Sequence, residues 1–136
     1  MTFERLTKFS KLIDQINKEN EMLDSLRLAA EPGAQKMTGM PHAQGVSDIV
    51  GNFGVEIAYL DEHIKQLKRE RDEELPVIEE YIASITDSRV HLAYRLRFVR
   101  GMRWKDVATC LGGRNTEDGV KSMCYRYYKL HRSDAL

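Results

Sequence analysis

The sequence predicts an all-α protein, with a long N-terminal helical hairpin followed by a small three-helix domain. Apolar residues recur in alternating steps of three and four along most of the chain, which is the period of an amphipathic α-helix. A composition of 42% hydrophobic residues, three prolines and nine glycines is typical of a soluble globular protein. We therefore predict a hairpin over residues 1–86 and a separate domain over residues 87–136.

The first expected helix ends near Glu31, because Pro32 and Gly33 follow. Its apolar stripe consists of Leu6, Phe9, Ile13, Ile16, Asn20 and Leu23. Leu12, Leu26 and Leu28 widen the stripe, which predicts burial against more than one neighbour. Residues 32–47 contain two prolines and three glycines and are expected to form a loop.

The second long helix is expected to begin at a Ser47 cap, with Asp48 in its first turn. Its stripe consists of Phe53, Ile57, Leu60, Ile64 and Leu67, and then, shifted by one position, of Leu75, Ile78, Ile82 and Ile85. Pro76 lies where the stripe shifts and predicts a kink. Two such helices cannot bury their stripes alone, so we expect a hairpin that also packs against a second copy. A homo-oligomer is therefore expected, with a dimer favoured.

The C-terminal domain begins after a plausible cap at Thr86-Asp87-Ser88. A helix is expected from Arg89 to Val99, closed by Gly101. The segment from Trp104 to Leu111 predicts a two-turn helix that ends at Gly112-Gly113. Large aromatic residues at helical spacing are usually core residues, so Trp104 and Tyr94 are expected inside.

The last helix is expected to begin at a Thr116 cap, followed by Glu117 and Asp118. Its inward positions are Val120, Met123, Cys124 and Tyr127. Its outward positions are Lys121, Ser122, Tyr125, Arg126 and Lys129. For Tyr125 and Tyr128 the pattern leaves packing and ligand contact equally open.

The charge is divided between the two parts of the chain. Residues 87–136 hold eleven Lys or Arg and five Asp or Glu, a net of +6, whereas residues 1–86 carry a net of −6. A basic end on a neutral protein is typical of a nucleic-acid binder whose other part has another role.

Other classes of function find no support in the sequence. No apolar run approaches the roughly 20 residues that cross a bilayer, and no secretion signal is visible, so we expect a cytoplasmic protein without membrane contact. Cys110 and Cys124 are expected to be reduced, buried thiols. The four histidines lack the spacing of a zinc site, and no nucleophile or phosphate-binding motif is present. We expect no enzyme, metal or cofactor.

The C-terminal pattern resembles region 4 of bacterial sigma factors. The matching residues are Arg97-Phe98-Val99, Gly101, Trp104, Asp106-Val107-Ala108, Leu111-Gly112 and Val120-Lys121. The tryptophan form resembles the small phage-encoded sigma-like regulators of late transcription, the ArpU-type and related families. This resemblance implies a helix-turn-helix whose second helix enters the major groove of double-stranded DNA, in a sequence-specific transcription regulator encoded by a phage or prophage.

Carried over to this sequence, the resemblance implies contacts of the last helix with base edges or flanking phosphates, and contacts of the preceding helix and turn with the DNA backbone. The candidate DNA-binding residues are Arg103, Lys105, Arg114, Thr116, Lys121, Ser122, Tyr125, Arg126 and Lys129. The turn departs from the family pattern, because Leu111 and Val120 are nine steps apart where about seven are usual. Glu117 and Asp118 would also repel phosphates.

Two alternatives remain open. The chain could be a small terminase-like DNA-packaging protein, in which long helices assemble a ring. It could also be an adaptor that does not bind DNA but docks on RNA polymerase, for which the longer turn and Glu117-Asp118 would suit a protein partner.

Overall fold

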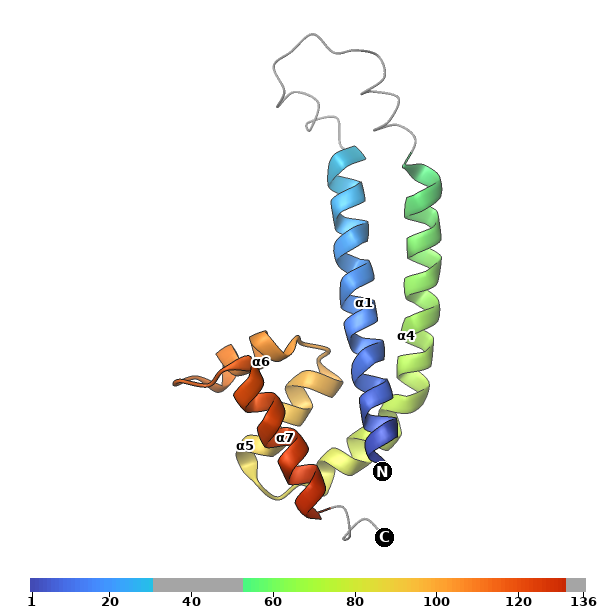
Figure 1. Ribbon diagram of the computed structural model, residues 1–136. Coiled ribbons are helices and arrows are strands. Elements are labelled where there is room, and N and C mark those ends of the chain that lie inside the picture. Colours follow the sequence, from blue (N-terminus) through green and yellow to red (C-terminus); the bar gives the residue numbers. More distant parts are fainter. Residues whose placement is uncertain (31–52, 132–136) are drawn as a thin grey trace. The chain divides into compact units, whose positions relative to one another are not determined.

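The computed structural model describes residues 1–30 and 53–131, and every regular element in these ranges is a helix (Figure 1). In chain order the elements are α1 (Phe3–Ala30), α4 (Gly54–Ala83), α5 (Ser88–Tyr94), the π-helix η1 (Arg95–Val99), α6 (Trp104–Leu111) and α7 (Glu117–His131). The prediction of an all-α protein is confirmed. The expected loop 32–47 and the Ser47 cap lie outside the described residues.

The chain forms two compact units, and α1 and α4 contribute to both. Unit 1 consists of residues 1–15 and 69–136, and unit 2 of residues 16–68. This division does not coincide with the predicted boundary after residue 86. The first turns of α1 and the last turns of α4 bury their stripes in the same core as the C-terminal helices, so these segments belong to one unit.

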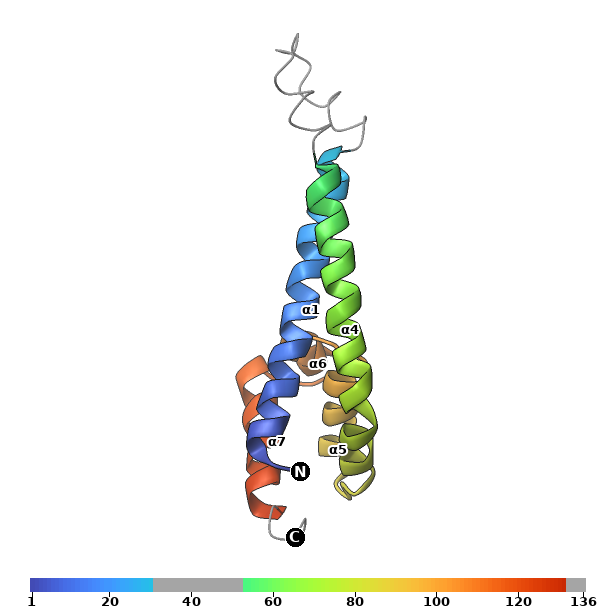
Figure 2. The same cartoon turned by 90° about the vertical axis from the view of Figure 1, so that its right-hand side faces the viewer.

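The core of unit 1 is rich in aromatic side chains. Tyr94 and Phe98 are almost fully buried, and Trp104 packs edge-on against Phe98 with ring centroids 6.1 Å apart. The predicted burial of Tyr94 and Trp104 is thus confirmed. Leu6, Phe9 and Ile13 of α1, Ile78 and Ile82 of α4, and Ile85 just after α4 complete this core. The first turn of α1 lies beside the last turns of α7 (Figure 2), where Phe3 contacts Tyr125 and Tyr128.

Unit 2 has a small core between antiparallel segments of α1 and α4. Leu23, Leu60 and Ile64 form its buried cluster, with Leu26 and Ile57 partly buried beside them. Arg27 donates to Asp61 at 3.0 Å, and buried Glu19 bonds the His63 ring. Leu28 is 65% exposed, so the expectation that it widens the buried stripe is wrong; its side chain lies on the outer side of α1.

Several predicted helix ends are confirmed. Asp87 caps α5 by accepting from two backbone N–H groups, and Gly101 takes a positive φ of 71° beyond η1. The helix expected from Arg89 to Val99 is α-helical only as far as Tyr94, and its last turn is a π-helix in which Arg100 N–H bonds the Arg95 carbonyl at 3.1 Å. Pro76 lies inside α4, which continues to Ala83.

Candidate functional site

The C-terminal helices α6 and α7 pack against each other through small and medium-sized side chains. Val107 and Ala108 of α6 are buried, as are Val120 and Cys124 of α7. The Tyr94 hydroxyl donates to the Cys124 backbone carbonyl at 2.8 Å, which ties the middle of α7 to α5. These contacts fix which side of α7 faces outward.

The connection between α6 and α7 is held by hydrogen bonds. Gly112 and Gly113 have φ values of 73° and 66°, a region that residues with a side chain rarely adopt. The Asn115 amide donates to the Gly112 carbonyl at 2.5 Å, and Arg89 donates to the Asn115 side-chain oxygen. The turn between α6 and α7 is therefore anchored to α5. This role of Asn115 was not predicted, although its place shortly after two turn glycines is a typical position for a side chain that bonds its own backbone.

Thr116 caps α7 as predicted. Its hydroxyl accepts from the Gly119 backbone N–H at 3.0 Å. A Cβ atom at Gly119 would lie only 2.9 Å from that hydroxyl, so the cap and the glycine fit each other. The exposed carboxylates of Glu117 and Asp118 lie in the same first turn, where the positive end of the helix dipole stabilises them.

Most of the candidate DNA-binding residues lie on the surface. Along α7, Lys121, Ser122, Arg126 and Lys129 are exposed. Ser122, Arg126 and Lys129 lie on the side of the helix opposite Val120 and Cys124, and Lys121 lies on the flank next to Tyr125 and Tyr128. Four further candidates are exposed: Arg103 just before α6, Lys105 in its first turn, and Arg114 and Thr116 between α6 and α7. The exposed basic candidates thus lie on α7, at the start of α6, and in the turn between these two helices.

Tyr125 is the exception among these candidates. Its ring is half-buried, 5.3 Å from Phe3 and 6.4 Å from Trp104 between centroids, and this burial raises the pKa of its hydroxyl. Of the two alternatives left open for Tyr125, the structure shows packing, because the first turn of α1 covers one flank of α7. Tyr128 is buried, and its hydroxyl donates to the Met1 carbonyl at 3.2 Å.

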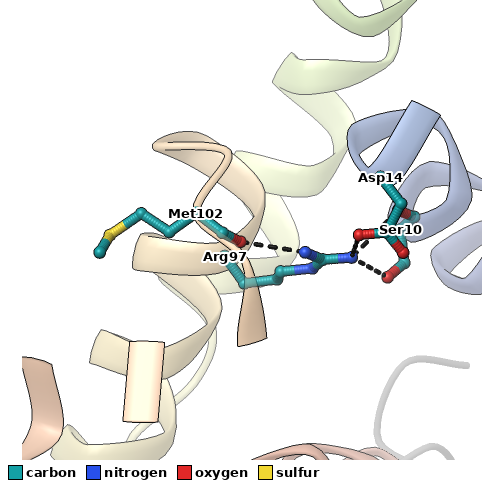
Figure 3. A network of polar contacts seen from close by, with 4 residues as sticks. All are labelled: Ser10, Asp14, Arg97 and Met102. Atoms are coloured by element: carbon teal, nitrogen blue, oxygen red, sulfur yellow. Dashed lines mark hydrogen bonds and ion pairs between the residues drawn. The ribbon is translucent and has the colours of Figure 1, made fainter. Parts of the chain in front are cut away.

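A buried arginine links α1 to the C-terminal helices (Figure 3). Arg97 is 0% exposed, and its guanidinium donates to the Met102 carbonyl at 3.0 Å, to the Ser10 hydroxyl at 2.8 Å and to the Asp14 carboxylate at 2.7 Å. It also lies 5.0 Å from the Trp104 ring centroid, within the range of a cation–π contact. Its charge is thus compensated inside the fold and adds nothing to the basic surface. The net charge of +6 over residues 87–136 therefore overstates the positive charge of that surface.

The two thiols differ in environment. Cys124 is buried, and burial raises the pKa of its thiol to about 12. Cys110 is exposed, so the expectation that both thiols are buried is wrong for this residue, which lies on the outer side of α6. Among the described residues, no three His, Cys, Asp or Glu side chains gather as metal ligands would. Nor does any helix in those ranges combine the length and apolarity that crossing a bilayer requires.

Comparison with known proteins finds no matching family model, no similar curated protein and no similar solved structure.

Proposed function

We propose that this protein is a sequence-specific DNA-binding transcription regulator, and that α6 and α7 form its helix-turn-helix. The observation that carries the proposal is the exposed basic surface of α7, where Lys121, Arg126 and Lys129 are accessible while Val120 and Cys124 hold the helix in the core. The resemblance of the Trp104–Gly112 pattern to sigma region 4 supports the same assignment.

The chemistry of this face suits a DNA duplex. An α-helix fits the major groove, where lysine and arginine side chains can reach guanine edges or the flanking phosphates. In the proposed docking, Lys121, Ser122 and Arg126 read base edges, and Lys129 contacts the backbone. Arg103, Lys105 and Arg114 extend the phosphate contacts from α6 and the turn. Tyr125, held by Phe3 and Trp104, contributes its ring edge at most and mainly orients α7.

The test begins with selection of bound duplexes from a random DNA pool by the full-length protein. Fluorescence anisotropy on a selected duplex then measures affinity across a salt series. Lys121→Ala and Arg126→Ala should each weaken binding by about ten-fold, and each lost phosphate contact should lower the salt slope by about one. Lys68→Ala, which removes an exposed lysine of α4 in unit 2, is the matched control and should leave affinity unchanged. Equal affinity of all three variants and the parent protein would exclude α7 as the recognition helix.

The full chain is needed for this test. Leu6, Phe9 and Ile13 of α1 belong to the core on which α6 and α7 rest. A fragment restricted to residues 87–136 would expose that core, and its failure to bind DNA would say nothing about α7.

One observation favours a second candidate, an adaptor that docks on RNA polymerase through α7. Glu117 and Asp118 are exposed at the end of α7 that a helix-turn-helix directs toward DNA, where carboxylates oppose phosphates. The double variant Glu117→Gln, Asp118→Asn distinguishes the two candidates. The double variant should bind the duplex several-fold more tightly if α7 binds DNA. It should bind purified polymerase less tightly if α7 is an adaptor surface.

A further inference from the structure

The start of α6 lies at the end of a short connection from η1. This connection spans residues 100–103, and Gly101 in it takes a positive φ of 71°. Arg103 occupies the N-cap position of α6, but its side chain makes no capping hydrogen bond. A helix start of this kind depends on other contacts to hold its first turn. The direction in which α6 begins, and with it the position of exposed Arg103, is therefore set by those contacts.

Arg97 holds the residues on both sides of Arg103. Its guanidinium donates to the Met102 carbonyl at 3.0 Å (Figure 3), and that carbonyl belongs to the peptide unit that joins Met102 to Arg103. The same guanidinium lies 5.0 Å from the centroid of the Trp104 ring. The Met102 N–H in turn donates to the Leu96 carbonyl at 3.1 Å. The backbone that carries the Arg103 side chain is thus fixed from within the core.

The guanidinium is itself immobilised from the opposite side. Its other terminal nitrogen donates to the Ser10 hydroxyl at 2.8 Å and to the Asp14 carboxylate at 2.7 Å (Figure 3). Arg97 is completely buried, so its contacts do not compete with water for the guanidinium. A planar guanidinium that is bonded on two sides has a single orientation available. Through Arg97, α1 therefore anchors the start of α6.

Stability alone does not account for an arginine at this position. Burial removes the guanidinium from water, and the Nε atom of Arg97, which is also buried, makes no hydrogen bond within the described residues. In other proteins, replacement of a buried ion pair by well-packed apolar side chains is often neutral or stabilising. The arginine is therefore better explained by the backbone that its guanidinium holds in place.

We propose that Arg97 is a positioning residue for DNA binding, which holds the start of α6 so that Arg103 reaches a phosphate of the bound duplex. The inference rests on the proposed function, in which Arg103 contacts the DNA backbone. Phosphate contacts fix the register and orientation of a protein on the duplex. A side chain on a fixed backbone loses less conformational freedom on binding than one on a mobile connection. Arg97 itself touches no DNA and acts through Arg103.

A double-mutant cycle between Arg97 and Arg103 tests the inference. Fluorescence anisotropy measures the Kd of the full-length protein for the selected duplex across a salt series. Arg103→Ala should raise Kd about five-fold and lower the salt slope by about one, because one phosphate contact is lost. Arg97→Lys should do the same, because one ammonium group cannot pair with the Asp14 carboxylate and also hold the Met102 carbonyl. The double variant should have a Kd within about two-fold of that of Arg103→Ala.

Ile82→Ala is the matched control for lost stability. Ile82 is a buried residue of α4 in the same core, and its truncation removes none of the hydrogen bonds of Arg97 or Met102, so Kd and the salt slope should stay unchanged. Circular dichroism verifies that each variant is folded. Where Arg97→Lys does not fold, Arg97→Met combined with Asp14→Asn replaces the buried ion pair by neutral side chains, and the same lack of additivity with Arg103→Ala is expected.

Independent effects, with the variant that combines Arg97→Lys and Arg103→Ala about 25-fold weaker than the parent protein, would overturn the inference. An unchanged Kd in either single variant, or equal effects of Ile82→Ala and Arg97→Lys, would also overturn it. These outcomes leave the proposed function intact, because the parent protein still binds the selected duplex. If the parent protein selects no duplex, the proposed function and this inference fail together.

Discussion

Replacing Arg97 by alanine should destabilise unit 1 strongly, because the guanidinium is a buried connector between α1 and the C-terminal helices. Its two terminal nitrogens serve opposite sides: one donates to the Met102 carbonyl, and the other to the Ser10 hydroxyl and the Asp14 carboxylate. In Arg97→Ala these acceptors lose their donor, and the space beside Trp104 is left empty.

The loss in the free energy of unfolding can be estimated from what each partner of Arg97 loses. Leaving the Ser10 hydroxyl or the Met102 carbonyl without its donor inside the protein lowers the free energy of unfolding by about 1 kcal/mol for each group. The contact with Trp104 and the void add about 1 kcal/mol each. The Asp14 side chain is 60% exposed and regains water, so the ion pair itself contributes less than about 1 kcal/mol. We expect a total loss of about 4 kcal/mol in the free energy of unfolding.

Urea unfolding followed by tryptophan fluorescence is the suitable assay, because Trp104 is the only tryptophan and lies beside Arg97. Arg97→Lys should lower the free energy of unfolding by about 2 kcal/mol, since one ammonium group cannot reach both the Met102 carbonyl and the Ser10 hydroxyl. Asp14→Asn should lose less than about 1 kcal/mol. Arg100→Ala, an exposed position three residues further on, is the control. If Arg97→Ala lowers the free energy of unfolding by less than about 1 kcal/mol, or if Asp14→Asn lowers it as much as Arg97→Ala does, the guanidinium is not the buried connector described above.

Three further predictions follow from the same structure. In a thiol-labelling assay, Cys110 should react in the folded protein and Cys124 only after denaturation, and two fast thiols would contradict the burial of Cys124. Burial raises the pKa of Cys124 from 9.0, and that of Tyr81 from 10.0, to about 12. The unfolded chain therefore releases these protons at a lower pH than the folded chain does. The free energy of unfolding is fully retained below about pH 9 and falls as the pH rises toward 12, by about 2 kcal/mol at pH 10.5 for Cys124 alone. A urea midpoint that stays constant from pH 8 to about pH 11 would disprove this. Thr116→Ala should lower the free energy of unfolding by about 1 kcal/mol, because the cap of α7 is lost. Gly119→Ala should raise it by up to about 1 kcal/mol only when Thr116 is also alanine, because otherwise the new Cβ lies 2.9 Å from the Thr116 hydroxyl. A double-mutant cycle measures this coupling, and equal gains in both backgrounds would show that the clash is absent from the folded protein.

The elements that could be predicted from the sequence are those with local signals. The bounds of α6 follow from its apolar spacing and from the two glycines after Leu111, and the Thr116 cap precedes α7 as expected. Periodicity also identified the buried side of α7 through Val120 and Cys124, because a helix repeats its environment every three or four residues.

The features that were missed depend on contacts between distant parts of the chain. Arg97 is 87 residues from Ser10, and no local pattern marks an arginine that will be buried. The same holds for Tyr125, whose outward position is covered by Phe3 from the opposite end of the sequence. The exposure of the candidate residues could therefore be predicted where it follows from helical spacing, and not where α1 packs on α7.

The pairing of the two chain ends has a consequence for folding during synthesis. The Tyr128 hydroxyl bonds the Met1 carbonyl, and Phe3 packs on Tyr125, so the first turn of α1 finds its partners only after the last helix has been made. Contacts of such high sequence separation slow folding and leave the apolar stripe of α1 exposed on the nascent chain. The final assembly of unit 1 therefore waits until α7 has emerged from the ribosome.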